Sequence, residues 1–292
     1  LSSERKENFF VDNRDDLTYD RKRYLYEQQL KSISTLREAG DLMIKAFFEG
    51  NTIKERINIQ NAYLASFNYS KKEEISEKVL EKDHHFLKEH RFEIKPFHWD
   101  LEFPEVFEKS QGGFDIFIGN PPFLGGKKIT AFAGDKFKQW LVFSNIQTNS
   151  NADLAAHFFR RCFSLLKVNG SCGLIATSTI SEGDTRRSGL KWICLNKGTI
   201  YSAQKRYRWP GVATVIVSTI HFYKGNYSGF KKLNGRFVDK ITPFLLSKGT
   251  NVDPYRLKRN KDKSFQGVNV LGQGFTFDDS VQSDDITPGI PS

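Results

Sequence analysis

Cysteine, methionine and long apolar runs are all scarce in this sequence of 292 residues. Its three cysteines, Cys162, Cys172 and Cys194, form no CxxC pair. An odd number of widely spaced cysteines argues against a disulfide framework and against a metal site, so we expect small core residues in a reduced, intracellular protein. No apolar run approaches the roughly 18 residues that span a bilayer. The polar, charged N-terminus shows no signal peptide. These absences indicate a globular protein without membrane contact.

The only methionine is Met43, and the chain begins with Leu1. Removal of an initiator methionine normally requires a small second residue, which leucine is not. We therefore expect residues 1–292 to be an internal piece of a longer protein or one product of processing.

Positive charge is concentrated in one half of the chain. Lys and Arg minus Asp and Glu sum to 0 over residues 1–98, to −1 over 99–150 and to +11 over 151–292 (21 basic, 10 acidic), which gives the total of +10. A field of this sign favours a polyanionic partner for the C-terminal half, although a merely basic, solvated surface would look the same.

Residues 1–95 are predicted to be mainly helical. The segment 18–50 carries apolar residues at helical spacing and ends at Gly50, and the segments 52–67 and 70–92 have the same character. The composition then changes at "KPFHWDLEFPEVF", which predicts a loop packed on a core.

Strands and helices alternate from Phe114 to Gly225, which is typical of an α/β sheet. Strands are predicted at 114–119, 171–177, 199–204 and 212–225. A helix is predicted to begin at Asn151 or Asp153, either of which can cap it, and to end at Asn169-Gly170. A second helix is predicted in the segment 181–198.

The stretch "FDIFIGNPPF" places two prolines directly after an apolar strand, so the strand must end there. Ligands of open α/β sheets bind beyond the carboxyl ends of the strands. The Asn120 amide oxygen and a rigid neighbouring carbonyl form an acceptor pair for an exocyclic NH2 group, and this keeps the nitrogen lone pair available for attack. Phe123 can lie against the face of a planar base.

"GFDIFIGNPPF" resembles the [DNS]-PP-[YFW] motif of amino-group methyltransferases. Together with "HWDLEFPEVF", "ADLAAHFFRRCFSLLKVNGSCGLIATSTISEGDTRRSGL", "GTIYSAQKRYRWPGVATVIVSTIHFYKG" and "SFQGVNVLGQGF", it is similar to the large N6-adenine DNA methyltransferases of bacterial restriction-modification and phage-exclusion systems. The resemblance runs from about residue 97 to 277. It implies a Rossmann-like (class I) methyltransferase sheet, double-stranded DNA as substrate, S-adenosylmethionine as methyl donor and a cytoplasmic location.

By this resemblance, Asn120 and Pro121 accept the N6 hydrogens of a flipped adenine, Pro122 shapes the turn and Phe123 stacks on the base. Asn120 also borders the cofactor. Asp153 is expected to be a helix cap, with a cofactor role as the alternative.

The family's glycine-rich cofactor loop, D-P-x-x-G-x-G, is absent from residues 1–113. The half of the sheet that carries this loop is therefore expected either upstream or on another polypeptide. The predicted domains are a helical region or insertion at 1–95, a catalytic half at 96–225, and an extension toward a target-recognition region at 226–292 with a disordered tail.

Further DNA contacts are predicted where cations alternate with aromatic side chains or follow the motif. The "KRYRWPG" segment is expected to be a loop, and a mobile loop is expected after the motif. The candidates are Lys127, Lys128, Arg186, Arg187, Arg206, Arg208 and Trp209. A solvated basic face is the alternative.

Two other functions stay open at this stage. The same acceptor pair would serve a methyltransferase for RNA bases or for a protein glutamine, although the latter has little need of so basic a C-terminal half. The second alternative is a non-catalytic DNA- or partner-binding subunit, which the missing cofactor loop favours. Affinity for S-adenosylmethionine would separate a catalytic unit from a binding module.

Overall fold

The computed structural model describes residues 16–70, 94–108, 110, 112–209, 215–255, 259 and 263. The chain divides into two compact units, Leu1–Val252 and Asp253–Ser292, and the description below concerns the first. The predicted helix after residue 70, the segment "SFQGVNVLGQGF" and the C-terminal tail lie outside the described residues.

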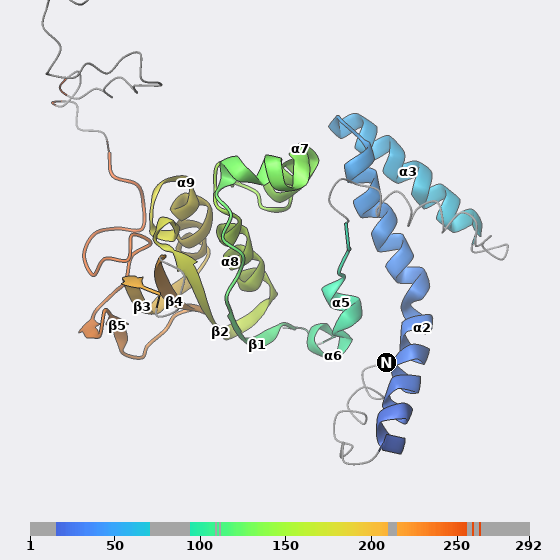
Figure 1. Cartoon of the computed structure of the whole chain (residues 1–292), viewed down its shortest axis with the longest axis horizontal. Coiled ribbons are helices and arrows are strands. Elements are labelled where there is room, and N and C mark those ends of the chain that lie inside the picture. Colours follow the sequence, from blue (N-terminus) through green and yellow to red (C-terminus); the bar gives the residue numbers. More distant parts are fainter. Residues whose placement is uncertain are drawn as a thin grey trace, which may run out of the picture. The chain divides into compact units, whose positions relative to one another are not determined.

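Two long helices form the N-terminal region, as the sequence predicts: α2 (Asp16–Glu49) and α3 (Ile53–Ser70) (Figure 1). The turn between them requires Gly50, because a Cβ at this position would lie 2.6 Å from Cγ of Arg56. The Thr52 hydroxyl accepts a hydrogen bond from the backbone N–H of Glu55 at 3.2 Å and so caps the start of α3.

Two single-turn helices connect this region to the sheet, where the sequence predicted a loop: α5 (Trp99–Glu102) and α6 (Pro104–Phe107). Proline at the first position of α6 favours a helical turn. The turns pack through aromatic rings, which was the predicted character of the segment. The cluster comprises Phe97, Trp99, Phe103, Phe107, Phe114 and Phe117.

Contacts between side chains fasten α2 to this connector. Nε2 of His98 lies 2.7 Å from Oδ1 of Asp41, and Arg37 pairs with Glu102. Gly40 makes room for the histidine, since a Cβ there would lie 2.4 Å from the imidazole ring.

A mixed sheet of six strands forms the centre of the unit, in the order β1-β2-β4-β3-β5-β6 (Figure 1). The strands are β1 (Phe114–Gly119), β2 (Leu166–Thr177), β3 (Gly198–Arg208), β4 (Ile216–Lys224), β5 (Lys231–Leu233) and β6 (Arg236–Val238). β1 is parallel to β2, β4 runs antiparallel to both β2 and β3, and β5 is parallel to β3. The carboxyl ends of β1, β2, β3 and β5 therefore lie at one edge of the sheet, which we call the carboxyl edge.

The helices that follow the strands supply the other half of the core. They are α7 (Gly126–Ser144), α8 (Leu154–Leu165) and a continuous helical segment formed by α9 (Gly183–Arg186), a π turn (Arg187–Lys191) and α10 (Trp192–Leu195). Phe159 of α8 and Ile193 of α10 are fully buried, together with Ile220 and Phe222 of β4. Alternate residues of the strands point into this core, as expected for a sheet packed on helices. The predicted α/β fold preceded by a helical region is confirmed.

The end of α8 differs from the prediction. The helix ends at Leu165 rather than at Asn169-Gly170, because Leu166 is extended, is buried at 1% exposure and pairs with Phe114 of β1. Asn169 does adopt a left-handed φ of +68°, but within an irregular start of β2, where the register against β1 shifts. Tertiary pairing with β1 therefore overrides the local stop signal.

Two further segments differ from the predictions. Lys205–Arg208 continue β3 instead of forming a loop, since Tyr207 and Arg208 pair with β4 beyond a bulge at Lys205 and Arg206. The sheet also extends beyond the predicted boundary at residue 225, because β5 and β6 are added next to β3, on the side opposite β1. These two strands are three residues long, and so short a run shows no alternating pattern that a sequence reading could use.

Candidate active site

The Asn-Pro-Pro-Phe motif follows β1 directly and lies at the carboxyl edge. Asn120 and Pro122 are exposed, Pro121 is buried, and Phe123 is half-buried against the core of α8, α10 and the sheet. The amide of Asn120 is thus exposed, while the buried Pro121 anchors the backbone of the motif. This exposure pattern suits an acceptor pair that faces a ligand.

Asp153 fastens the motif to the start of α8. Its Oδ1 accepts a hydrogen bond from the backbone N–H of Ala155 at 2.9 Å and one from the N–H of Leu124, the residue after the motif, at 3.3 Å. The backbone N–H of Leu154 donates to the carbonyl of Leu124 at 2.9 Å. The predicted helix-cap role of Asp153 is confirmed. With 7% exposure and its Oδ1 occupied by two donors, the carboxylate is poorly placed to receive a cofactor as well.

Arg160 of α8 fixes the segment between α7 and α8. This buried guanidinium donates to Oγ1 of Thr148 and to the carbonyl of Ile146, both at 2.7 Å, and lies 4.0 Å from the ring centroid of Trp192. Burial lowers the pKa of Arg160 to about 10, so the group is still protonated at neutral pH. The segment in turn lies against Gly126, where a Cβ would be 2.3 Å from the backbone of Asn151.

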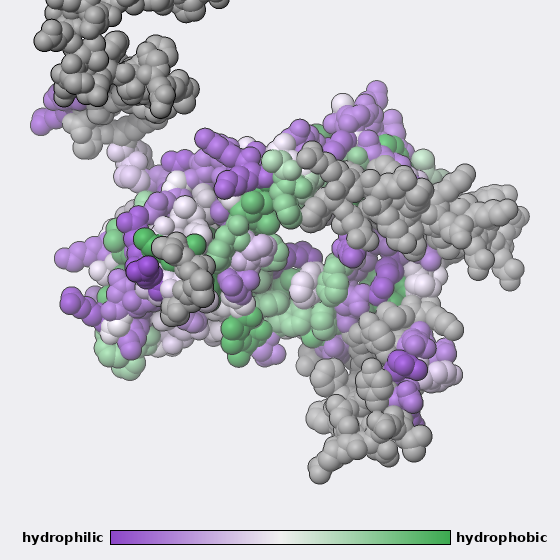
Figure 2. Space-filling view, in the orientation of Figure 1, coloured by the Kyte–Doolittle hydropathy of each residue, from purple (hydrophilic) through white to green (hydrophobic). Residues whose placement is uncertain are grey.

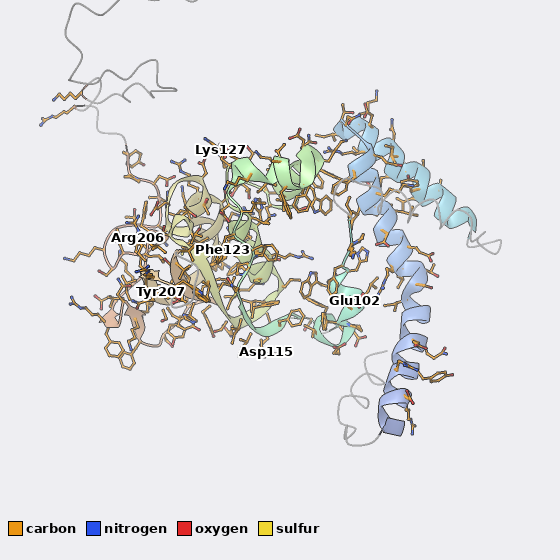
Figure 3. All side chains as sticks on the ribbon, viewed as in Figure 1. Glu102, Asp115, Phe123, Lys127, Arg206 and Tyr207 are labelled. Carbon is orange, nitrogen blue, oxygen red and sulfur yellow. The ribbon has the colours of Figure 1, made fainter. Side chains whose placement is uncertain are left out.

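Lys127 and Lys128 lie in the first turn of α7 rather than in a mobile loop, and both are exposed. Helix α7 begins at Gly126, three residues after Phe123, and Figure 3 labels Phe123 and Lys127 on either side of this junction. Both lysines are therefore on an ordered element next to the candidate site. The helix contains one break, at Gly134, which has a φ of +83°.

The predicted DNA contacts at 186–209 separate into two kinds. Arg186 is buried at 3% exposure, with its guanidinium 3.9 Å from the ring centroid of Phe244, so burial removes it from the candidates for phosphate contact. Arg187 is exposed and pairs with Asp184 at 3.0 Å. Arg206 and Arg208 are exposed at the carboxyl end of β3, and Trp209 is half-buried directly after that strand. Arg206 and Arg208 thus belong to a strand and not to the predicted loop.

One contact within the site had no signal in the sequence. Arg206, which has a left-handed φ of +52°, pairs with Glu182 at the start of α9 and also donates its backbone N–H to Oγ of Ser218 at 3.1 Å. This contact joins the segment after β2 to the end of β3. The carboxyl edge consequently carries the motif, the start of α7 and the cationic end of β3; Figure 3 labels Phe123, Lys127 and Arg206.

The cysteines play no visible part in this site. All three are free thiols; Cys172 is fully buried, and Cys162 and Cys194 are half-buried. Burial raises the pKa of the Cys194 thiol to about 12, which keeps it unreactive. Among the described residues, no cluster of His, Cys, Asp or Glu is arranged to hold a metal ion. None of the helices described is long and apolar enough to cross a membrane.

The described residues thus form a mixed sheet with an Asn-Pro-Pro-Phe turn at its carboxyl edge. The model of the family described as "Eco57I restriction-modification methylase" matches residues 22–202 of this chain, which is more than half of it. The chain belongs to this family.

Known relatives agree with the family assignment. The "Adenine-specific methyltransferase BrxX" of Escherichia coli O9:H4 (strain HS) is 29% identical over 121 residues, which are 41% of this chain and 10% of the relative. The matched part thus spans about a tenth of the length of that curated relative.

Two solved structures are also similar. One is the Type IIL restriction-modification enzyme MmeI in complex with DNA, with 23% identity, a TM-score of 0.39, and coverage of 45% of this chain and 19% of that one. The other is the M protein of the Type I restriction enzyme EcoKI, with 16% identity, a TM-score of 0.30, and coverage of 40% and 22%.

Proposed function

We propose that this chain carries the catalytic motif of a DNA methyltransferase that transfers a methyl group from S-adenosylmethionine to N6 of a flipped adenine. The observation that carries the proposal is the exposed Asn120 on a turn anchored at the carboxyl edge of the sheet. Family membership and the adenine-specific relative support the substrate class. A cytoplasmic setting, where DNA is accessible, is part of the same proposal.

The motif acts on the attacking nitrogen. The side-chain oxygen of Asn120 and the carbonyl of Pro121 accept the two N6 hydrogens, which stops the lone pair from delocalising into the ring and stabilises positive charge as the nitrogen attacks. With the donor bound, a C–N bond would form as the C–S bond of the donor breaks, S-adenosylhomocysteine would leave, and N6 would lose one proton to water. Phe123 supports the extruded base with the part of its ring that the core leaves uncovered.

The described residues do not form a complete site for the methyl donor. S-adenosylmethionine supplies an electrophilic methyl group when bound, and Asn120 is the one predicted cofactor neighbour that is still exposed. Asp153 is buried and already hydrogen-bonded, and the sequence contains no D-P-x-x-G-x-G loop before the motif. The residues present therefore fit the base better than they fit the cofactor.

A second sheet segment that carries the cofactor loop is proposed to dock along β1. This strand is the end strand of the sheet, and its Ile116 and Ile118 are 63% and 86% exposed. Figure 2 shows strongly apolar surface where β1 lies in Figure 1. An end strand with exposed isoleucines favours pairing with a further strand. Either an upstream segment or another polypeptide could provide it.

The test is transfer of labelled methyl from S-adenosylmethionine to unmethylated duplex DNA, by this chain alone and together with the segment proposed to carry the cofactor loop. We expect N6-methyladenine that disappears in Asn120→Ala. Label from the chain alone would show that no further segment is needed. Label that survives Asn120→Ala would refute the role of the motif. Absence of label in both arrangements, with DNA binding retained, would leave a non-catalytic DNA-binding module.

A further inference from the structure

Two phenylalanine rings are exposed on the β5–β6 hairpin, outside the site described above. Phe230 and Phe237 are 86% and 73% exposed, and their ring centroids lie 5.6 Å apart in an edge-to-face arrangement. Figure 2 shows apolar surface among hydrophilic residues where β5 lies in Figure 1. A pair of large aromatic side chains held together in solvent marks an interaction site more often than a structural feature.

The hairpin has one inward and one outward face. Leu233 and Val238 are half-buried and pack on the core. Lys232 pairs with Phe237 across the two strands, and because side chains alternate along a strand, Phe230 lies on the same side as these two. We call Phe230, Lys232 and Phe237 the outward face. Burial of the opposite face fixes the register of β5 against β6. A shift of one residue would bury the rings and expose Leu233 and Val238, so the exposure of the rings is a property of this register.

A shallow groove accompanies the rings. Its volume is about 360 Å³, and its lining consists of Gly229, Phe230, Lys231, Phe237, Val238 and Asp239. The groove thus offers apolar and cationic groups side by side.

Charge indicates the kind of partner. The hairpin carries Lys231, Lys232 and Arg236 against one carboxylate, Asp239. Within the described part of the chain, none of the three cations is found in an ion pair. A surface that combines exposed rings with an excess of positive charge is complementary to a polyanion with apolar sugar and base surfaces, and poorly complementary to a second copy of itself.

The hairpin is continuous with the candidate active site. β5 runs parallel to β3, with Ala203 opposite Leu233, so the turn at Asn234-Gly235 lies at the carboxyl edge. Oδ1 of Asn234 accepts a hydrogen bond from the backbone N–H of Lys205 at 2.7 Å, which ties the turn to the segment that leads into Arg206. The cations of the hairpin therefore extend the basic end of β3 along the same edge.

We propose that the β5–β6 hairpin binds the duplex that flanks the target base, through its outward face and through the exposed Arg236, which follows the turn and lies opposite Leu233. Lys232 and Arg236 neutralise phosphates, while Phe230 and Phe237 pack against deoxyribose and base edges in the minor groove. The inference rests on the proposed function only in taking duplex DNA as the substrate. It adds a binding site that requires neither the motif nor the cofactor.

Fluorescence anisotropy with a labelled duplex, measured on the full chain at several salt concentrations, tests this inference. In Lys232→Ala/Arg236→Ala we expect the slope of log K against log salt to become shallower by about 1.8, because each phosphate contact contributes about 0.9. In Phe230→Ala/Phe237→Ala we expect about tenfold weaker binding with an unchanged slope. Matched controls on α3 should change neither quantity: Lys54→Ala for charge, and Ile53→Ala/Ile57→Ala for exposed apolar surface, these isoleucines being 74% and 50% exposed.

Several outcomes would overturn the proposal. They are an absence of duplex binding by the unsubstituted chain, hairpin variants that bind like the α3 controls, and hairpin variants that alter self-association in sedimentation instead of DNA affinity. Urea unfolding of each variant excludes loss of fold as the cause, and single Lys232→Ala provides a milder change with an expected slope difference of about 0.9. Asn120→Ala should keep hairpin-dependent binding, so a failure of methyl transfer and a failure of this inference are distinguishable.

Discussion

Replacement of Asp153 tests how the fold holds the motif in place. Asp153→Ala removes a helix cap, which costs about 1 kcal/mol, and leaves the N–H of Leu124 without its acceptor in a partly buried position, which costs about 1–2 kcal/mol more. The contact to Leu124 is long, at 3.3 Å, so its contribution is taken from the lower part of the usual range. We expect the free energy of unfolding to fall by about 2–3 kcal/mol and the Tm by about 4–12 °C for a unit of this size.

Asp153→Asn is the matched control, because an asparagine oxygen can accept the same two hydrogen bonds and asparagine is an equally good cap. Urea and thermal unfolding followed by circular dichroism should show a loss below about 0.5 kcal/mol for this variant. Methyl transfer, measured below the unfolding temperature of both variants, should fall in Asp153→Ala and persist in Asp153→Asn.

Two results would refute this reasoning. An alanine variant as stable as the unsubstituted chain would show that the cap and the contact to Leu124 carry no weight. An asparagine variant that keeps its stability and loses transfer would show that the carboxylate charge is needed in the reaction, as in the alternative cofactor role.

Three further predictions follow from particular contacts. Phe123→Ala should weaken binding of the flipped base by about 1–3 kcal/mol, whereas Phe123→Trp should retain most of it; equal losses, measured with an abasic-site competitor, would contradict stacking. Gly126→Ala should destabilise the fold by about 1–3 kcal/mol, because its Cβ would lie 2.3 Å from the backbone of Asn151, while Gly125→Ala meets nothing within 4 Å and should be neutral in urea unfolding. Burial lowers the pKa of His157 from 6.5 to about 4, so the unfolded state binds more protons between these values. The neutral ring therefore contributes fully above pH 6.5, and up to about 3 kcal/mol is lost as pH falls toward 4; His157→Gln should flatten this pH dependence of unfolding.

Local signals were sufficient for much of the fold. The helices α2 and α3, the strand β1 and the cap at Asp153 were all predictable, because helical spacing, an apolar run stopped by prolines and an aspartate before an apolar stripe are encoded within a few neighbouring residues. The motif itself could be placed at a strand end for the same reason, and its order among neighbouring segments pointed to the methyltransferase family.

Contacts between segments distant in the sequence determined the other features of the fold. Asn169-Gly170 carries a strong helix-stop signal, yet α8 ends earlier because Leu166 gains more by pairing with β1 inside the core. Arg186 and Arg206 look alike in the sequence. Only the packed structure buries one against Phe244 and exposes the other beside Glu182, since the burial of a cation depends on which distant segments surround it. The sequence by itself therefore determined the fold class and the motif. The tertiary structure determined which cations reach the carboxyl edge and that a short hairpin, too brief to show a pattern in the sequence, exposes two aromatic rings.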